Sequence, residues 1–151
     1  MRYIAFICGH NSGRSQMAQG VFNYLKKLYP SVDAAYEAIS WGTGIKENGT
    51  VNPKVIEPMK AIGIDLTDTN IHYPKIIDHP FIQEKLKNVT RAFTMGCMDK
   101  VCELPAGMQI SSEDIVDWDL DDPADDETDV NAVRNQILGN TLGLIFELSK
   151  V

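Results

Sequence analysis

The sequence lacks any apolar run of the roughly 18 to 20 residues that a membrane-spanning helix needs. Its first apolar run, residues 3–7, is short and ends in a glycine-bearing loop, so it does not read as a signal peptide. Cysteine is also scarce, because the chain contains three, an odd number that argues against a secreted disulfide framework. We therefore expect a cytoplasmic protein whose thiols are reduced.

Positively charged residues are also few: the chain has 14 Lys and Arg residues and 21 Asp and Glu residues, which gives a net charge of −7. This balance disfavours nucleic acid or an anionic membrane as a partner. Nearly half of the acidic residues lie in the segment 113–129, and a solvated acidic face accounts for most of them. The histidines and cysteines have no metal-ligand spacing, so we expect no metal and no organic cofactor.

A chain of 151 residues with 44% hydrophobic and 23% charged residues is expected to form a single domain, 1–151. Apolar runs predict strands, and helical periodicity predicts helices between them. This alternation predicts a three-layer α/β fold, a four-stranded parallel sheet flanked by helices. The expected strands are 3–7, 35–41, 89–95 and 115–118, and the expected helices are 17–28, 52–63, 81–86 and 130–148.

Some side chains in these elements carry specific expectations. Leu28 falls on the apolar face of the first helix and should be buried, whereas Lys26 falls on the outer face. His72 and His79 lie in the irregular segment 67–80, where we expect solvated loop positions.

The most informative stretch is Cys-Gly-His-Asn-Ser-Gly-Arg-Ser-Gln, residues 8–16, which joins the first strand to the first helix. Successive N–H groups in such a turn form a nest for an oxyanion, and the helix N-terminus adds partial positive charge. We expect Gly9 and Gly13 to take positive φ or to allow close approach of the anion, and Arg14 to supply a planar fork. Cys8 then lies at the floor of the nest, where its thiolate is stabilised as a nucleophile. The oxyanion-binding candidates are Gly9, His10, Asn11, Ser12, Gly13 and Arg14.

Two further cysteines, Cys97 and Cys102, directly follow the third strand. Ligands bind at the carboxyl ends of parallel strands, so we expect Cys97 to open near Cys8. Each thiol alone is compatible with simple filling of space, but two of them beside an activated third favour a redox function. In an intact helix these positions are separated by a rise of about 7.5 Å, more than the roughly 7 Å limit for a disulfide. Forming this disulfide should therefore unwind the segment.

One acidic residue in the segment 113–129 precedes a proline, which holds it in an extended conformation. This residue, Asp122, is a candidate proton donor aimed into the site. Its neighbour Asp121 remains the alternative.

The strings Cys8–Gln16 and Asp122-Pro123-Ala124 resemble those of the low-molecular-weight protein tyrosine phosphatase superfamily, which includes the thioredoxin-coupled arsenate reductases. Arg-Ser-Gln and Asp-Pro-Ala are similar to the reductase branch, because the phosphatases usually have Arg-Ser-Pro and a tyrosine after Asp-Pro. Gly13 departs from both branches, in which a second cysteine commonly precedes the arginine.

The resemblance implies that this protein reduces arsenate to arsenite. In this scheme Cys8 attacks arsenic, Ser15 hydrogen-bonds to its thiolate, and Asp122 protonates the departing oxygen. Cys97 then attacks the Cys8 sulfur, Cys102 attacks Cys97, and thioredoxin reduces the resulting disulfide. We expect a monomer without a metal or organic cofactor.

Several alternatives stay open. A phosphatase would use the same nucleophile, arginine and acid but would not need Cys97 or Cys102. A third possibility is an anion-binding or signalling module without catalytic activity. Glutaredoxin is an alternative electron donor. Reductases of the superfamily can also bind potassium through Asn11 and a nearby acid, but the corresponding position here is Gln19. We therefore claim no potassium site.

Overall fold

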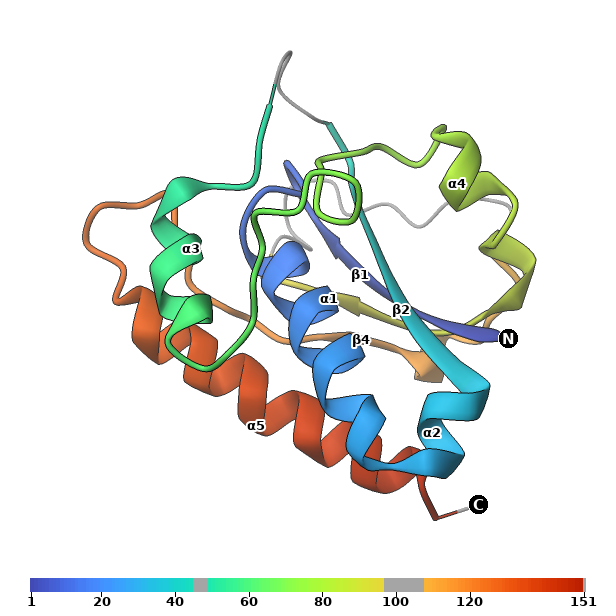
Figure 1. Cartoon of the computed structure of the whole chain (residues 1–151). Helices are drawn as coiled ribbons and strands as arrows, with labels where there is room; N and C mark the ends of the chain where they lie inside the picture. Colours follow the sequence, from blue (N-terminus) through green and yellow to red (C-terminus); the bar gives the residue numbers. More distant parts are fainter. Residues whose placement is uncertain (45–48, 97–107, 151) are drawn as a thin grey trace.

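In the computed structural model, residues 1–44, 49–96 and 108–150 are described. Their strands form one parallel sheet with the order β2-β1-β3-β4, which confirms the predicted four-stranded parallel sheet (Figure 1). The strand bounds are β1 Arg2–Cys8, β2 Tyr36–Gly42, β3 Val89–Thr94 and β4 Ile115–Asp117.

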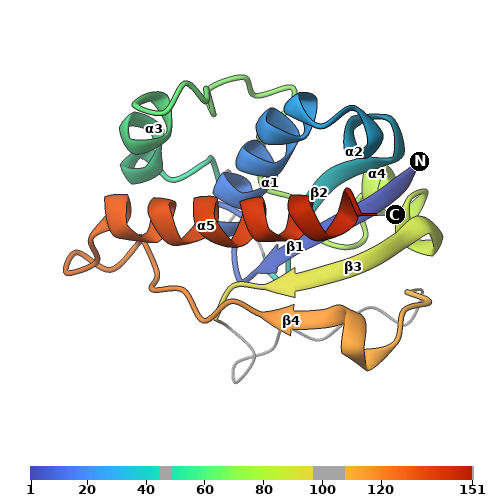
Figure 2. The same ribbon diagram turned by 90° about the horizontal axis from the view of Figure 1, so that it is seen from below.

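Helices cover both faces of this sheet and give the predicted three layers. The long helices α1 (Arg14–Leu25) and α5 (Val130–Leu148) lie on one face together with α3 (Pro53–Lys60), as Figure 2 shows. The opposite face is covered by the short α4 (Pro80–Gln83) and the 3₁₀ turn η2 (Leu86–Asn88). None of the described helices is both long and apolar enough to cross a membrane.

The central strand β1 shows why its sequence is a continuous apolar run. Ile4 and Phe6 pack into the core beneath α1 and α5, whereas Ala5 and Ile7 pack into the core on the α4 side. Because both faces of a central parallel strand are covered, alternation with polar residues disappears.

The end of the first helix differs from the prediction. Helix α1 ends at Leu25, a 3₁₀ turn (η1, Lys26–Leu28) follows, and Leu28 is 71% exposed rather than buried. The tighter 3₁₀ turn rotates the chain away from the helical register on which that prediction depended. Lys26 also departs from the outward orientation, because its Nζ donates to the Tyr36 carbonyl at 3.0 Å.

Two other parts of the chain differ from the helical prediction. Pro30 does not only end a helix, since it begins the short helix α2 (Pro30–Ala35). The predicted helix 81–86 is divided into α4 and η2. The Asn-Pro start of α3 is present as predicted, with the Asn52 side chain accepting the Lys54 N–H at 3.0 Å.

The strand order has a consequence for ligand binding. From β1 the chain moves to β2 on one side, and the later strands β3 and β4 are added on the other side. Strands β1 and β3 are neighbours, and the connections that follow them run to opposite sides of the sheet. Such a switch point is where open α/β sheets bind ligands, and Cys8 is the last residue of β1.

Candidate active site

Cys8 is buried at the carboxyl end of β1, with 3% of its surface exposed. Its Sγ lies 2.8 Å from Ser15 Oγ and accepts the Asn11 N–H at 3.2 Å. The Ser15 hydroxyl already accepts a hydrogen bond from Asn11 Nδ2 at 2.8 Å, so its own proton is free to point at the sulfur. Both contacts therefore favour a thiolate at Cys8, since each presents a donor to the sulfur.

Asn11 sets the shape of the loop. It is fully buried and has a φ of 52°, in the left-handed region that asparagine tolerates better than most residues. Of the two roles expected for the loop glycines, positive φ is wrong, because Gly13 has a φ of −125° and Gly9 is not among the positive-φ residues. Close approach of the anion to these glycines stays a prediction. Unlike glycine, asparagine has a side-chain amide, and here it makes hydrogen bonds to Ser15 and to the backbone of Lys75.

The Asn11 amide is held by Gln16 from the first turn of α1. Gln16 Nε2 donates to the Asn11 carbonyl at 3.1 Å, and Asn11 Oδ1 lies at 3.2 Å from the same nitrogen. Gln16 Nε2 also lies 3.0 Å from the Tyr73 carbonyl, which ties the loop to the segment before α4. Because Gln16 Nε2 is the donor in these contacts, its Oε1 is an acceptor, and it faces His72 Nδ1 at 3.2 Å.

His72 is buried, with 8% of its surface exposed, so the prediction of a solvated loop position is wrong. Burial lowers the pKa of His72, and the positive charge of Lys75 lowers it further. The neutral imidazole carries its proton on Nδ1, because the partner there is the Gln16 oxygen. Sequence reasoning missed this support for the loop, since the two residues lie 56 positions apart.

The end of β2 approaches the loop closely at Gly42. A Cβ added there would lie 2.8 Å from the Gly9 carbonyl oxygen and 2.9 Å from the Asn11 nitrogen. Both neighbours are backbone atoms that cannot rotate away, so the contact needs glycine at this position. Thr43 N–H continues the contact by donating to the Cys8 carbonyl at 3.1 Å.

Two other loop residues make supporting contacts. His10 Nδ1 lies 2.9 Å from the Gly44 carbonyl oxygen, so its side chain braces the loop against the end of β2. The Ser12 carbonyl accepts the Asn52 N–H at 2.7 Å, which joins the loop to the start of α3. The loop backbone is thus fixed from two sides.

Arg14 is the first residue of α1 and connects the loop to the ends of β3 and β4. Its Nη1 donates to the carbonyls of Met95 and Leu120, the latter at 2.8 Å. Its Nη2 lies 3.7 Å from Asp122 Oδ2. These contacts engage both hydrogens of Nη1, so the N–H groups of Nε and Nη2 are the ones that remain for a ligand.

Asp122 is the carboxylate that the structure brings to Arg14. Its side chain is 54% exposed, and its Oδ1 accepts the Ala124 N–H at 2.9 Å, while the following Pro123 is buried next to Gly13. Asp121 is exposed and makes no hydrogen bond or ion pair with the described residues. The geometry therefore favours Asp122 over Asp121 as the candidate acid.

Cys97 and Cys102 lie outside the described residues. The preceding Gly96 has a φ of 88°, and a Cβ there would lie 2.8 Å from the Leu120 carbonyl oxygen and 3.3 Å from Arg14 Nη1. Its N–H donates to Asp117 Oδ1 at 2.8 Å. The chain that leads to Cys97 thus reaches the arginine of the site.

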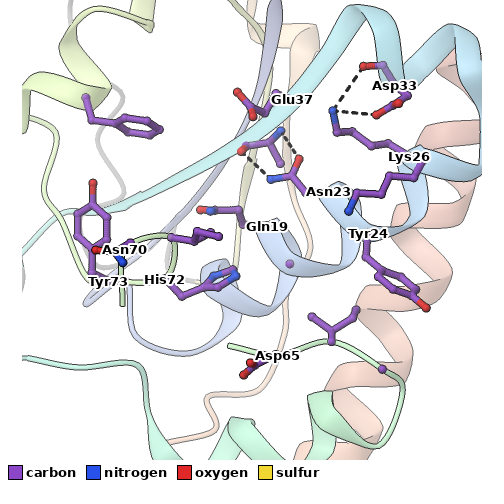
Figure 3. A pocket seen from close by; sticks show the side chains of 17 residues that line it. Gln19, Asn23, Tyr24, Lys26, Asp33, Glu37, Asp65, Asn70, His72 and Tyr73 are labelled. Atoms are coloured by element: carbon purple, nitrogen blue, oxygen red, sulfur yellow. Dashed lines mark hydrogen bonds and ion pairs between the residues drawn. The ribbon is translucent and has the colours of Figure 1, made fainter. Parts of the chain in front are cut away.

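A pocket of about 610 Å³ lies beside the loop rather than on it. Figure 3 shows Gln19 and His72 facing this pocket together with Asn23. Gln19 Oε1 accepts the Ser40 hydroxyl, so this carboxamide is already engaged. Within the described ranges, no cluster of three or more His, Cys, Asp or Glu residues could hold a metal ion. Cys8 and Arg14 do not line this pocket.

Comparisons with known proteins agree with this geometry. A family model described as "Low molecular weight phosphotyrosine protein phosphatase" matches residues 3–150. A curated relative, arsenate reductase of Staphylococcus aureus (strain Newman), is 37% identical over 122 residues, which cover 80% of this chain and 78% of the relative.

Two solved structures are similar over nearly the whole chain. One, described as an arsenate reductase in the phosphate-binding state, has a TM-score of 0.73 and 25% identity, covering 98% of this chain and 99% of the other. A thioredoxin-dependent arsenate reductase of Corynebacterium glutamicum has a TM-score of 0.68 and 24% identity, covering 98% of this chain and 62% of the other. The second likeness concerns the fold alone.

Proposed function

We propose that this chain, which belongs to the low molecular weight phosphotyrosine protein phosphatase family, is a cytoplasmic, single-domain arsenate reductase regenerated by thioredoxin. The observation that carries the proposal is the 37% identity to a staphylococcal arsenate reductase over 80% of the chain. The geometry around Cys8 supports it, because a buried cysteine with two hydrogen-bond partners, the N-terminus of α1 and an Asp122–Arg14 ion pair lie at one switch point.

Arsenate binding is assigned to the loop 9–13 and Arg14. The loop amides form the nest, and the start of α1 adds its partial positive charge. Arg14 Nε and Nη2 offer the planar fork for two arsenate oxygens, since the carbonyls of Met95 and Leu120 already hold Nη1. This anchoring fixes the guanidinium before the substrate arrives.

The first chemical step forms a bond between Cys8 Sγ and arsenic(V). The Ser15 hydroxyl and the Asn11 N–H stabilise the attacking thiolate. One arsenate oxygen leaves as water after it receives a proton from Asp122, the carboxyl group beside Arg14. The product is a covalent arsenic adduct on Cys8.

The reduction follows from the other two cysteines. The thiolate of Cys97 attacks the Cys8 sulfur, the S–As bond breaks, and its electron pair reduces arsenic(V) to arsenic(III), which leaves as arsenite. Cys102 then attacks Cys97 and releases Cys8 as a thiolate. Thioredoxin reduces the Cys97–Cys102 disulfide by exchange, so two electrons enter for each arsenate reduced.

Arsenate-dependent NADPH oxidation with thioredoxin and thioredoxin reductase tests this scheme. We expect turnover in the wild type and none in Cys8→Ser, Cys97→Ser or Cys102→Ser. Without thioredoxin, the wild type and Cys102→Ser should each release a single equivalent of arsenite per chain, whereas Cys97→Ser should release none. Replacing thioredoxin by glutaredoxin and glutathione distinguishes the two electron donors.

Hydrolysis of p-nitrophenyl phosphate by the same variants tests the phosphatase alternative. That activity needs Cys8 but not the two later cysteines. A protein that reduces no arsenate, and whose ester hydrolysis is unaffected by Cys97→Ser and Cys102→Ser, would be a phosphatase.

A further inference from the structure

Lys75 is a buried cation with no role in the scheme above. Only 2% of its surface is exposed, and its Nζ donates to the Tyr73 carbonyl at 3.2 Å and lies 4.6 Å from the centroid of the Tyr73 ring. Among the residues that the structure describes, no carboxylate forms an ion pair with it. A buried charge without a counter-ion lowers the stability of a protein. A functional role for the Lys75 ammonium would explain its presence in the core.

The backbone of Lys75 and the neighbouring Tyr73 connect it to the anion loop, residues 8–14, at several points. Its N–H donates to Asn11 Oδ1 at 3.1 Å, and its carbonyl accepts the Gly42 N–H at 2.8 Å. The Tyr73 carbonyl that accepts from Nζ also lies 3.0 Å from Gln16 Nε2. The backbone of Lys75 therefore contacts the loop directly, and its ammonium shares the Tyr73 carbonyl with Gln16, which bonds Asn11.

We propose that the Lys75 ammonium is a fixed positive charge behind the anion loop, and that its counter-ions are the bound oxyanion and the Cys8 thiolate. Lys75 is thus a positioning residue whose charge acts on the loop without touching the substrate, while its backbone N–H holds Asn11 Oδ1. This role of Lys75 rests on the proposed function only in that the loop binds an oxyanion. In a site with a low effective dielectric, such a charge acts across the loop without direct contact.

The other ionisable groups around the ammonium do not neutralise it. Tyr73 is its aromatic neighbour, and the His79 ring lies 5.6 Å from the Tyr73 ring. His72 on the same segment has its pKa lowered partly by Lys75. Arg14, on the other side of the loop, adds a second positive charge toward the anion. Burial also lowers the pKa of Lys75, to about 8, so the ammonium is the main form at neutral pH.

The test uses a Cys97→Ser/Cys102→Ser background, in which Cys8 is the only cysteine left of the three. Into it we introduce Lys75→Met, which removes the charge and keeps an unbranched side chain, and Lys75→Arg, which keeps the charge. Lys60→Met is the matched control, because it removes the same charge from an exposed position on α3. Inorganic phosphate is the probe of the anion site, and iodoacetamide is the probe of the Cys8 thiolate.

We expect Lys75→Met to weaken phosphate binding about 5- to 10-fold at pH 7 and to move the midpoint of the pH–alkylation profile upward by about half to one pH unit. Lys75→Arg should recover part of both effects, and Lys60→Met should stay within about twofold of the background. Calorimetry measures the first quantity, and the alkylation rate across pH measures the second.

Unchanged phosphate affinity and an unchanged alkylation midpoint in Lys75→Met would overturn the proposal. A lower melting temperature without either change would assign Lys75 a structural role instead. Failure of arsenate turnover in the wild type, with both shifts present, would refute the proposed reductase function and leave this inference standing.

Discussion

The anion loop (residues 8–14) and the acid segment (residues 120–129) each carry a charged group of the site, but they are built in opposite ways. In the loop, Asn11 is fully buried and bonds partners as far as 64 positions away. In the acid segment, the carboxylate of Asp122 is 54% exposed, and its hydrogen bond goes to a backbone N–H two positions away. The loop is therefore fixed by the fold, whereas the acid segment is shaped mainly by its own sequence.

This difference matches what each part does chemically. A nucleophile and an anion cradle gain from donors that are already oriented, because no reorganisation is then needed during the reaction. A proton donor must exchange its proton with water after each turnover, which an exposed carboxyl group allows.

Replacing the exposed acid should affect chemistry and leave stability unchanged. We expect Asp122→Asn to lower kcat by about 10²- to 10⁴-fold, because the amide cannot protonate the departing oxygen. The matched control is Asp121→Asn, one position earlier, which should stay within about threefold of the wild type. Arsenate-dependent NADPH oxidation at saturating thioredoxin measures the rate, and a urea melt checks the stability. If the two variants exchanged these phenotypes, Asp121 would be the acid.

Replacing the central residue of the loop should affect both properties. Asn11→Ala removes the acceptor of the Lys75 N–H and the donor to Ser15 Oγ, and it puts alanine at a φ of 52°. We expect a loss of about 2–4 kcal/mol in the free energy of unfolding and a large loss of turnover. Asn140→Ala, at an exposed position of α5, should change stability by less than about 0.5 kcal/mol. A loss of activity at full stability would show that the loop does not depend on this network.

The buried cation behind the loop predicts a pH dependence of stability. The pKa of Lys75 is about 8 in the folded protein, compared with 10.5 for an unperturbed lysine, so the unfolded chain binds more protons between these values. The free energy of unfolding should therefore rise with pH across this window, by about 3 kcal/mol in all. Lys75→Met should lack this contribution, and its advantage over the wild type should be greatest below pH 8. Urea melts at pH 7.5 and 10 measure the difference, and parallel curves for the two proteins would contradict it.

Sequence reasoning worked where the signal is local in the chain. The central strand β1 contains the continuous apolar run 3–7, and Asn52 and Pro53 mark the start of α3. The anion loop is a contiguous string between a strand and a helix, so its position could be predicted without knowledge of the fold. The acid segment is also local, because the proline after Asp122 restricts its conformation.

The supports of the loop could not be predicted in the same way. His72, Lys75 and Gly42 are far from the loop in the sequence, and only the packing of β2 and the segment before α4 brings them beside Asn11 and Gln16. Polar residues in an irregular segment look like solvated loop residues until their burial is known. The choice of Asn11 rather than a glycine for positive φ has the same origin, because the asparagine amide needs these distant partners.

The smallest expected effect concerns the contact between β2 and the loop. Gly42→Ala places a Cβ within 3.0 Å of three backbone atoms, so β2 and the loop must separate slightly. We expect a loss of about 1–3 kcal/mol in the free energy of unfolding, together with weaker phosphate binding. Gly44→Ala is the control, since a Cβ there meets no atom within 4 Å and its N–H bond to the Gly9 carbonyl is kept. Equal effects from the two substitutions would mean that the loop is held from within, by Asn11 and Gln16, and not by the end of β2.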